Sequence, residues 1–290
     1  MMSKIIDGKH VASIIREKIK KETAELVAAT GKQPNLTVII VGENPASQSY
    51  VRSKKKFATE VGFQSDTIQL PEMTTEVELL AQVEKLNHDA RVNGILIQLP
   101  LPPHINQQNV IRAIAIEKDV DGFHPEQVGG LSLGLDTLEP CTPAGIIELL
   151  KHYEIQIAGK NAVIIGRSNI VGKPIANMLL KLDATVTITH SRTVNLAEIT
   201  RLADILVVAI GKPHFLTADM VKEGAVVIDV GINRTAEKKL VGDVDYEEVK
   251  EKVSYITPVP GGVGPMTIAM LLENTLEAFK KQLLASQSYR

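Results

Sequence analysis

Residues 162–174 combine features that suit the binding of a phosphate group. Residues 162–165 are apolar and mostly β-branched, which predicts a buried strand, and this run ends at Gly166. A polar turn over residues 167–169 follows, and Gly172-Lys173-Pro174 leads into a segment with helical apolar spacing. Free N–H groups and the dipole at a helix N-terminus attract anions, so this order of elements predicts a phosphate site. The spacing is G-x-x-x-x-x-G rather than the common dinucleotide fingerprint, and an ordinary strand–helix turn explains the motif alone about equally well.

The end of the next predicted strand distinguishes between the two nicotinamide dinucleotides. Residues 184–189 are followed by Ser191 and Arg192, with no carboxylate where an NAD site binds the ribose hydroxyls. A hydroxyl beside Arg192 and Arg167 suits the ribose phosphate of NADP, because guanidinium pairs with phosphate in a charge-assisted fork. We therefore expect NADP rather than NAD, although a single arginine considered alone fits a solvated loop charge better.

Tyr50 and Lys54 are a second candidate for chemistry, because their i, i+4 spacing places them on one face of a helix. Tyr-x-x-x-Lys is also the acid–base pair of the short-chain dehydrogenases, where it comes after the dinucleotide-binding turn. Here the pair comes well before that turn, so the order of the motifs argues against a short-chain dehydrogenase. By composition alone, the three lysines of residues 54–56 are best interpreted as a solvated charge run.

Strands and helices that could position these residues alternate along the chain, which implies parallel sheets with right-handed crossovers. Ser47 could cap the helix that carries Tyr50 and Lys54, and Thr74 or Thr75 could cap the next helix. Residues 257–267 are rich in proline and glycine, which predicts an extended, closely approached loop. The other predicted helices cover residues 11–29, 74–87, 106–114, 143–153 and 268–284, and the other predicted strands cover residues 36–41, 63–70, 94–98, 205–209, 225–229 and 253–256.

Composition favours a globular protein without a large charged partner. The chain has 290 residues, of which 44% are hydrophobic and 23% charged, and its formal net charge is −2. This balance gives no reason to expect nucleic acid or a membrane as partner, so basic clusters are better interpreted as local sites for small anions. The single cysteine excludes an internal disulfide, and the histidines lack metal-ligand spacing, so we expect no metal. Without a membrane-length apolar run or a signal-peptide region, we expect a cytoplasmic protein.

Six short motifs occur in a fixed order along the chain. They are YVRSK at 50–54, QLPLP at 98–102, KDVDGF at 118–123, PCTP at 140–143, GRSNIVGKP at 166–174 and PVPGGVGPMT at 258–267. Together they closely resemble the bifunctional methylenetetrahydrofolate dehydrogenase/methenyltetrahydrofolate cyclohydrolase family, over essentially the whole chain. Each motif alone is modest, but six in order are highly specific.

The resemblance implies two reactions and a role in tetrahydrofolate interconversion and purine biosynthesis. In the first, a hydride leaves the methylene bridge of methylenetetrahydrofolate for the nicotinamide of NADP, and the folate nitrogen lone pair stabilises the cation. That step needs two rings held face to face rather than a protein acid or base. In the second, water attacks the methenyl cation and the ring opens to formyltetrahydrofolate, which requires proton transfers.

Lys54 is the expected proton-transfer residue, because burial and a cationic substrate both disfavour its ammonium form and should lower its pKa. We expect Gln98 to hold the lysine amine and Tyr50 to stack on the folate. The carboxylate of Asp121 suits the pterin, although a turn role before Gly122 is the better explanation without the family. The loop residues Pro260, Gly261 and Gly262 are expected to line the substrate pocket. Cofactor contacts are expected from Gly166, Arg167, Ser168, Ile170, Gly172, Ser191, Arg192 and Ile232.

The expected fold is α/β with two α/β domains and the active-site cleft between them. Composition changes at residues 138–143, where we place the domain boundary. Residues 1–139 form the expected folate-binding domain, completed by a helix over 267–290, and residues 140–266 form a Rossmann-like, doubly wound parallel sheet that binds NADP. The family further suggests a homodimer formed through the nucleotide domain.

Three other functions remain open from the sequence. A different NADP dehydrogenase, such as one with a shikimate-like substrate, could share the two-domain plan, but it does not account for Tyr50, Gln98 and residues 258–266 together. A non-catalytic NADP-sensing module would bind cofactor and turn nothing over. A monofunctional dehydrogenase lacking cyclohydrolase activity is the third, and the intact Lys54 argues against it.

Overall fold

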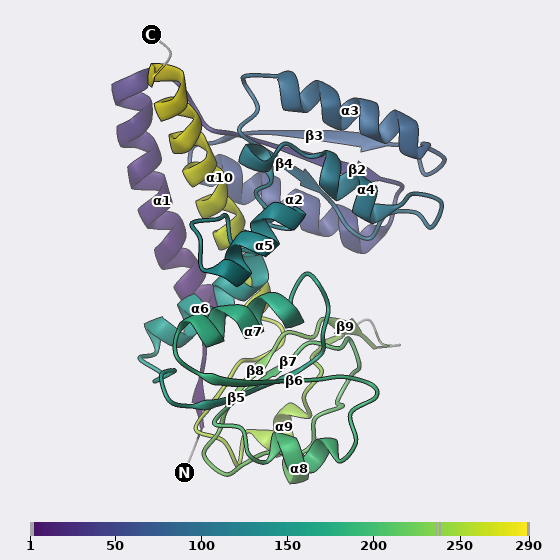
Figure 1. Cartoon of the computed structure of the whole chain (residues 1–290), viewed down its shortest axis with the longest axis vertical. Coiled ribbons are helices and arrows are strands. Elements are labelled where there is room, and N and C mark those ends of the chain that lie inside the picture. The colour runs from purple at the N-terminus through teal and green to yellow at the C-terminus, as the bar shows by residue number, and fades with distance from the viewer. Residues whose placement is uncertain (1–2, 236, 238, 289–290) are drawn as a thin grey trace. The chain divides into compact units, whose positions relative to one another are not determined.

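The computed structural model describes residues 3–235, 237 and 239–288, and the chain divides into two compact units (Figure 1). Unit 1 comprises Met1–Ser13, Leu131–Leu135 and Pro140–Met270. Unit 2 comprises Ile14–Gly130, Asp136–Glu139 and Leu271–Arg290. Two long helices, α1 (Gly8–Thr30) and α10 (Val263–Ser288), contribute residues to both units.

Unit 1 is built on a six-stranded sheet in the order β1-β11-β8-β7-β5-β6. All of its strand pairs are parallel, as the alternation of strands and helices in the sequence predicts. A short antiparallel hairpin of β9 (Asn233–Arg234) and β10 (Leu240–Val241), which was not predicted, follows β8. The sheet strands are β1 (Lys4–Ile5), β5 (Asn161–Ile165), β6 (Thr185–Thr189), β7 (Ile205–Val208), β8 (Val226–Asp229) and β11 (Tyr255–Ile256).

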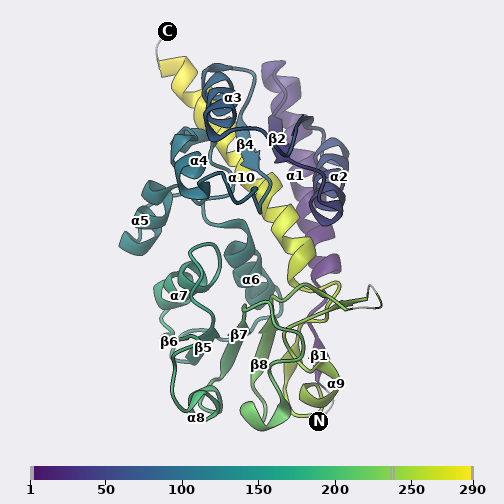
Figure 2. The ribbon, with the colours of Figure 1, turned by 90° about the vertical axis from the view of Figure 1, so that its right-hand side faces the viewer.

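Helices cover both faces of this sheet (Figures 1 and 2). On one face lie α6 (Cys141–His152) and α7 (Gly172–Lys181). On the other lie α8 (Leu196–Thr200), the 3-10 turn η2 (Ala218–Met220) and α9 (Tyr246–Val249), which cover a core of buried aliphatic residues. β5, β7 and β8 are buried on both faces and therefore read as continuous apolar runs. The predicted Rossmann-like, doubly wound arrangement is confirmed.

Unit 2 has a three-stranded parallel sheet in the order β3-β2-β4, formed by β3 (Gln64–Leu70), β2 (Asn35–Val41) and β4 (Gly94–Ile97). Alternate residues of β2 and β4 pack with α3 (Glu76–His88) and α4 (Gln107–Ala113) in one apolar cluster. α2 (Pro45–Glu60) packs against β2 and β3 and joins a second cluster with α1 and α10. The predicted α/β class is thus confirmed in this unit as well.

Two helix caps in unit 2 show how local chemistry sets the helix starts. Thr75 caps α3, with its hydroxyl accepting from the Glu78 N–H and the Glu78 side chain returning to the Thr75 N–H, so the second of the two predicted caps is confirmed. The prediction that Ser47 caps α2 is wrong. Asn44 is the cap, because Pro45 suits the first helical position and the Asn44 side chain accepts from two N–H groups of the first turn.

Other elements differ from the sequence-based predictions at their boundaries. α5 (Pro125–Leu133) was not predicted, because its two central glycines disfavour a helix in isolation. α10 begins at Val263 rather than residue 268, so the second half of the predicted extended loop is helical. Pro265 is tolerated there because N–H groups in a first helical turn have no intrahelical partner. The short η1 helix (Ile116–Lys118) precedes the segment that carries Asp121.

Among the residues that the structure describes, none of the helices is long and apolar enough to cross a membrane.

Candidate active site and cofactor site

Lys54 and Gln98 are in direct contact in unit 2. Lys54 Nζ donates a hydrogen bond of 3.0 Å to Gln98 Oε1. Gln98 Nε2 donates to the Leu99 carbonyl at 2.7 Å, which directs the amide oxygen toward the lysine. The backbone N–H of Gln98 extends the sheet by one bond, donating to the Ile39 carbonyl at 2.8 Å. A lysine from α2 is therefore held at the carboxyl edge of the sheet by a residue from the end of β4.

Lys54 differs from its two neighbours in exposure. It is 9% exposed, whereas Lys55 and Lys56 are exposed to solvent. Its position continues the buried stripe of α2, which includes Val51 at i−3, so interpreting residues 54–56 as a wholly solvated run is wrong for Lys54. Tyr50, 36% exposed, precedes Lys54 by one helical turn, where its ring is accessible to a ligand.

Asp121 lies on a turn at the end of β4. A parallel β-bridge joins Ile95 to Asp119, and Asp121, two residues further on, lines a small hollow together with Ile97 and Leu99. Gly94 allows the segment that carries Asp121 to pack this closely against β4, because a Cβ on Gly94 would lie 2.6 Å from Val120 Cγ1. Asp121 is half-buried and precedes a glycine with φ of +70°, so it also occupies the turn position that was considered as its structural role. Asp121 and Gln98 therefore both lie near the carboxyl end of β4.

Asp119 serves the structure of this turn. It is 1% exposed, and its carboxylate accepts from the His124 N–H at 2.7 Å. Burial raises the pKa of Asp119 to about 7, the His124 N–H opposes that rise, and the nearby Asp121 charge adds to it. Lys118 donates to three carbonyls at the end of α3, at 2.8 to 2.9 Å, and ties the start of the turn to that helix. Asp121 is thus carried by a turn that is anchored on both sides.

In unit 1 the chain passes from β5 to β6 on one side and then to β7 on the other. In open parallel sheets, ligands bind outside the carboxyl ends of the strands at such a reversal. Gly166, which follows β5, has φ of +123°, and a Cβ there would lie 2.4 Å from the Ala209 carbonyl oxygen after β7. A Cβ on Gly172 would lie 2.3 Å from the Gly166 carbonyl oxygen. Both glycines are therefore required for a closely approached turn, which fits the pyrophosphate of a dinucleotide.

The turn between these glycines is organised by Ser168. Its hydroxyl accepts from the Val171 and Gly172 N–H groups, each at 3.2 Å, at the start of α7. Arg167 and Ser168 are exposed, while Ile170 is half-buried. The predicted cofactor residues of this segment thus lie together in one turn at a helix N-terminus.

The end of β6 lies beside the same turn. The Gly166 N–H donates to the Thr189 carbonyl at 3.0 Å, and Ser191 and Arg192 follow two and three residues later. Both are exposed, and the Arg192 N–H donates to His190 Nδ1 at 3.1 Å. The tertiary structure therefore brings the predicted ribose-phosphate residues next to the predicted pyrophosphate turn.

The loop before α10 is closely packed against the start of α1 within unit 1. A Cβ on Gly8 would lie 1.8 Å from the Gly262 carbonyl oxygen, and the Lys9 N–H donates to the Gly261 carbonyl at 3.0 Å. Gly261 has φ of +111°, and the peptide bond before Pro260 is cis. Gly8 and Gly262 leave no room for a Cβ at this crossing, and Gly261 is favoured by its positive φ.

Ile232 lies 44% exposed after β8, and its Cδ1 is 3.5 Å from the position of a Cβ on Gly264. Two buried carboxylates beside it, Asp229 and Asp243, were missed by the sequence analysis. Burial raises the pKa of Asp229 to about 6, against the opposing effect of three backbone N–H groups. A carboxylate at the end of a continuous apolar strand was the available signal for Asp229.

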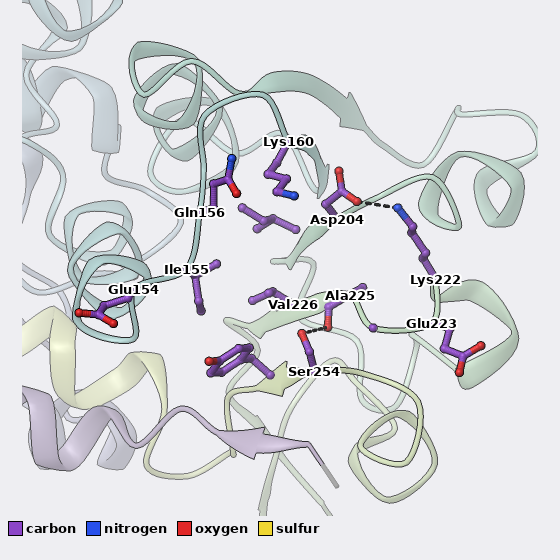
Figure 3. Close-up of a pocket in the computed structure, with 13 residues that line it drawn as sticks. Glu154, Ile155, Gln156, Lys160, Asp204, Lys222, Glu223, Ala225, Val226 and Ser254 are labelled. Carbon is purple, nitrogen blue, oxygen red and sulfur yellow. Dashed lines mark hydrogen bonds and ion pairs between the residues drawn. The ribbon is translucent and has the colours of Figure 1, made fainter. Parts of the chain in front are cut away.

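An open pocket of about 350 Å³ in unit 1 lies at the opposite edge of the sheet (Figure 3). It is lined by residues at or near the starts of strands, among them Asp204, Val226 and Ser254. Two of its lining residues are joined by a hydrogen bond of 2.6 Å from Lys222 to Asp204. Because dinucleotides bind at the carboxyl ends of strands, this pocket is not the cofactor site.

Comparison with known proteins identifies the family. The profile described as "Tetrahydrofolate dehydrogenase/cyclohydrolase, catalytic domain" matches residues 6–121, and its "NAD(P)-binding domain" counterpart matches residues 140–283. The "Bifunctional protein FolD" of Listeria innocua serovar 6a is 58% identical over 280 residues, covering 97% of this chain and 98% of the relative.

Solved structures agree with this family match. The bifunctional FolD dehydrogenase/cyclohydrolase of Campylobacter jejuni has a TM-score of 0.94 at 54% identity, over 96% of this chain and 99% of that chain. The Trypanosoma brucei enzyme, complexed with NADP cofactor and an inhibitor, has a TM-score of 0.94 at 40% identity, over 98% and 99% of the two chains. The family and enzyme class predicted from the six motifs are confirmed: the chain belongs to the bifunctional tetrahydrofolate dehydrogenase/cyclohydrolase family of enzymes.

Proposed function

We propose that this enzyme oxidises methylenetetrahydrofolate to methenyltetrahydrofolate with NADP and then hydrolyses the product to formyltetrahydrofolate, with Lys54, Gln98 and Tyr50 as the catalytic set. The observation that carries this proposal is the hydrogen bond between Lys54 and Gln98, because it places a buried, oriented amine on the catalytic-domain part of the family match. A monofunctional dehydrogenase would have no need of that amine.

In the oxidation, the chain's own residues bind and orient the substrate. The substrate nitrogen stabilises the developing cation, so no protein acid or base is required. When bound, the nicotinamide supplies a hydride acceptor. The side chain of Tyr50 is accessible for stacking on the folate, and the carboxylate of Asp121 is suited to accept two parallel N–H bonds from the pterin amino group and ring nitrogen.

In the hydrolysis, Lys54 moves the protons. Water loses a proton as it attacks the methenyl carbon, and the leaving ring nitrogen gains one. A cationic substrate beside a buried amine favours the neutral form of Lys54, which accepts the water proton. Gln98 Oε1 accepts a hydrogen bond from Nζ, while the amide is fixed by Leu99, so the amine stays oriented through the cycle.

For the cofactor, we propose NADP bound by the turn after β5 and the end of β6. Gly166 and Gly172 leave no room for side chains and Ser168 orders the turn, which supports a pyrophosphate there. Ser191 and Arg192 are exposed beside that turn, with Arg167, and would hold the ribose phosphate. Ile170 and Ile232 would contribute apolar contacts, and the backbone of Pro260, Gly261 and Gly262 would border the substrate and nicotinamide pockets.

The proposed division of labour places folate binding in residues 1–139 and 267–290 and NADP binding in residues 140–266. Residues 1–13, 131–135 and 267–270 are exceptions, since they belong to unit 1, where β1 pairs with β11. Hydrogen exchange with NADP alone tests the division. We expect slower exchange in peptides from residues 140–266, and protection centred on residues 35–130 would contradict it.

We further propose a cytoplasmic homodimer formed through the nucleotide-binding part. β6 is the edge strand of the unit 1 sheet, with Ile188 40% exposed, and Leu180 of α7 is 61% exposed. An edge strand with apolar neighbours is a template for pairing with a second copy. Light scattering should give twice the chain mass, and a monomer at micromolar concentration would contradict the dimer. Fractionation of producing cells tests the location.

A turnover assay with folate and NADP tests the main proposal, with methenyl and NADPH followed separately by absorbance. We expect NADPH to accumulate while methenyl appears only transiently. Persistent methenyltetrahydrofolate would contradict the proposed cyclohydrolase activity, while the dehydrogenase activity would still be supported. NADP binding without turnover would favour another substrate or a sensing module.

A further inference from the structure

A pair of buried carboxylates lies at the carboxyl edge of the unit 1 sheet. Asp229 ends β8 and is 3% exposed, and Asp243 follows the β9–β10 hairpin and is 0% exposed. Burying a carboxylate is costly unless hydrogen bonds compensate it. Neither group has a role in the chemistry described above, so their partners indicate what they do.

Asp243 connects two loops that are far apart in the sequence. Its Oδ2 accepts from the Ile210 N–H at 2.7 Å and from the Gly211 N–H at 2.9 Å, in the loop after β7. Its Oδ1 accepts from Asn233 Nδ2 at 2.8 Å, in the hairpin after β8. One carboxylate therefore sets the spacing between these two loops.

Asp229 fixes the backbone next to Asp243 and at Gly231 through hydrogen bonds to its carboxylate. It accepts from the Gly231 and Asp243 N–H groups, both at 2.9 Å, and from the Val244 N–H at 3.0 Å. A Cβ on Gly231 would lie 2.3 Å from Asp243 Oδ1, and one on Gly242 would lie 1.7 Å from Asp229 Oδ2. Glycines at both positions let the carboxylates sit directly against the backbone.

These contacts converge on Ile232. The residue before it donates its N–H to Asp229, and the side chain of the residue after it donates to Asp243. Ile232 itself is 44% exposed, so its side chain is free to meet a ligand while its backbone is fixed. The loop after β7 begins at Ala209, whose carbonyl lies against Gly166 of the phosphate turn. The loop after β7 therefore borders the phosphate turn, and the hydrogen bonds of Asp243 connect the hairpin after β8 to that loop.

We propose that Asp243 is a positioning residue for the cofactor, which fixes the backbone of residues 210–211 and 231–233 so that they receive the nicotinamide end of NADP. This inference rests on the proposed NADP site. The Asp243 carboxylate accepts hydrogen bonds from both loops and would act through them. Replacing Asp243 should therefore weaken NADP binding and slow the oxidation, and should leave the hydrolysis of methenyltetrahydrofolate unchanged.

The test uses the full-length Asp243→Asn variant. An amide can accept at one end only, so its NH₂ must face donors, either the two backbone N–H groups or Asn233. We expect NADP binding measured by calorimetry to weaken about tenfold, as for loss of hydrogen bonds to a buried charge. The KM for methylenetetrahydrofolate and the hydrolysis of supplied methenyltetrahydrofolate, which needs no NADP, should change less than about twofold, and intact hydrolysis shows that the variant folds.

Asp204→Asn is the matched control. Asp204 is also a carboxylate in unit 1 that accepts from a backbone N–H, that of Asn161 at 2.9 Å, and from a side chain, but it lies at the amino edge of the sheet (Figure 3). Its variant should bind NADP normally. A milder second variant, Asn233→Ala, removes one donor to Asp243 and should weaken NADP binding about two- to fivefold.

Unchanged NADP affinity in both Asp243→Asn and Asn233→Ala would overturn the positioning role. An equal loss of NADP affinity in Asp204→Asn would also overturn the positioning role, because the loss would then come from general destabilisation of unit 1. Calorimetry does not depend on folate turnover. A wild-type protein that binds NADP but turns over no folate would contradict the proposed function while leaving the role of Asp243 testable.

Discussion

Lys54 Nζ and Gln98 Oε1 lie 3.0 Å apart, joined by a hydrogen bond between α2 and the residue that follows β4. The two residues are 44 positions apart in the sequence. This bond and its burial distinguish Lys54 from the two lysines that follow it, because Lys55 and Lys56 are exposed. This geometry supports our proposal that an oriented, buried amine, rather than an exposed lysine, transfers the protons in the hydrolysis.

Lys54→Met should lower the cyclohydrolase rate by about 10²- to 10⁴-fold, the usual contribution of a general acid or base. Methionine is an unbranched side chain of similar size but cannot transfer a proton. The dehydrogenase should lose far less, because hydride transfer needs no protein base. Steady-state assays of both reactions make the comparison, with Lys55→Met as the exposed control. Equal losses in the two activities would disprove the assigned role.

Asp121→Asn should raise the KM for folate about ten- to a hundredfold in both reactions, because an amide cannot accept two parallel N–H bonds with a full charge. The KM for NADP should stay unchanged. Asp136→Asn serves as control, since that exposed carboxylate pairs with Lys281 at 2.9 Å elsewhere in unit 2. Folate affinity equal to that of the wild type would argue against the pterin contact.

Arg192→Ala should raise the KM for NADP about tenfold and leave that for NAD nearly unchanged, because the guanidinium is expected to pair with the ribose phosphate only NADP carries. Arg201→Ala is the matched control. Arg201 is also an exposed arginine of unit 1, but it precedes β7 and donates to the Asp219 carbonyl at 2.7 Å. If the wild-type enzyme uses NAD as efficiently as NADP, the cofactor assignment fails.

Asp119 should make stability depend on pH. Burial raises its pKa from 3.8 to about 7 in the folded protein, so the folded state binds the extra proton. Its contribution to stability is therefore fully present below about pH 4 and is lost as pH rises toward 7. Asp119→Asn removes this titration while an amide oxygen can still accept from His124. Denaturant unfolding between pH 4.5 and 7.5 should show a weaker fall in stability for the variant than for the wild type. Parallel curves would show that Asp119 is ionised throughout this range.

The six motifs supplied most of the candidate site residues through the family that they resemble. The sequence by itself determined the α/β class and the order of the main strands and helices. These follow from local causes. Apolar periodicity sets the elements, and the glycine turn after residues 162–165 requires a conformation that other residues avoid. The six motifs identified the family, and the family match confirms it.

Only the tertiary structure decided which of the candidate residues meet. The exposure of Lys54 depends on the face that α2 presents to its sheet, and three consecutive lysines look alike until that face is known. The helical start of α10 overrides its proline and glycine content. The cap of α2 is different, because Asn44 rather than Ser47 caps that helix for the local reason that Pro45 suits the first helical position. Asp243 was missed because hydrogen bonds between loops that are separated in the chain leave no periodic trace in the sequence.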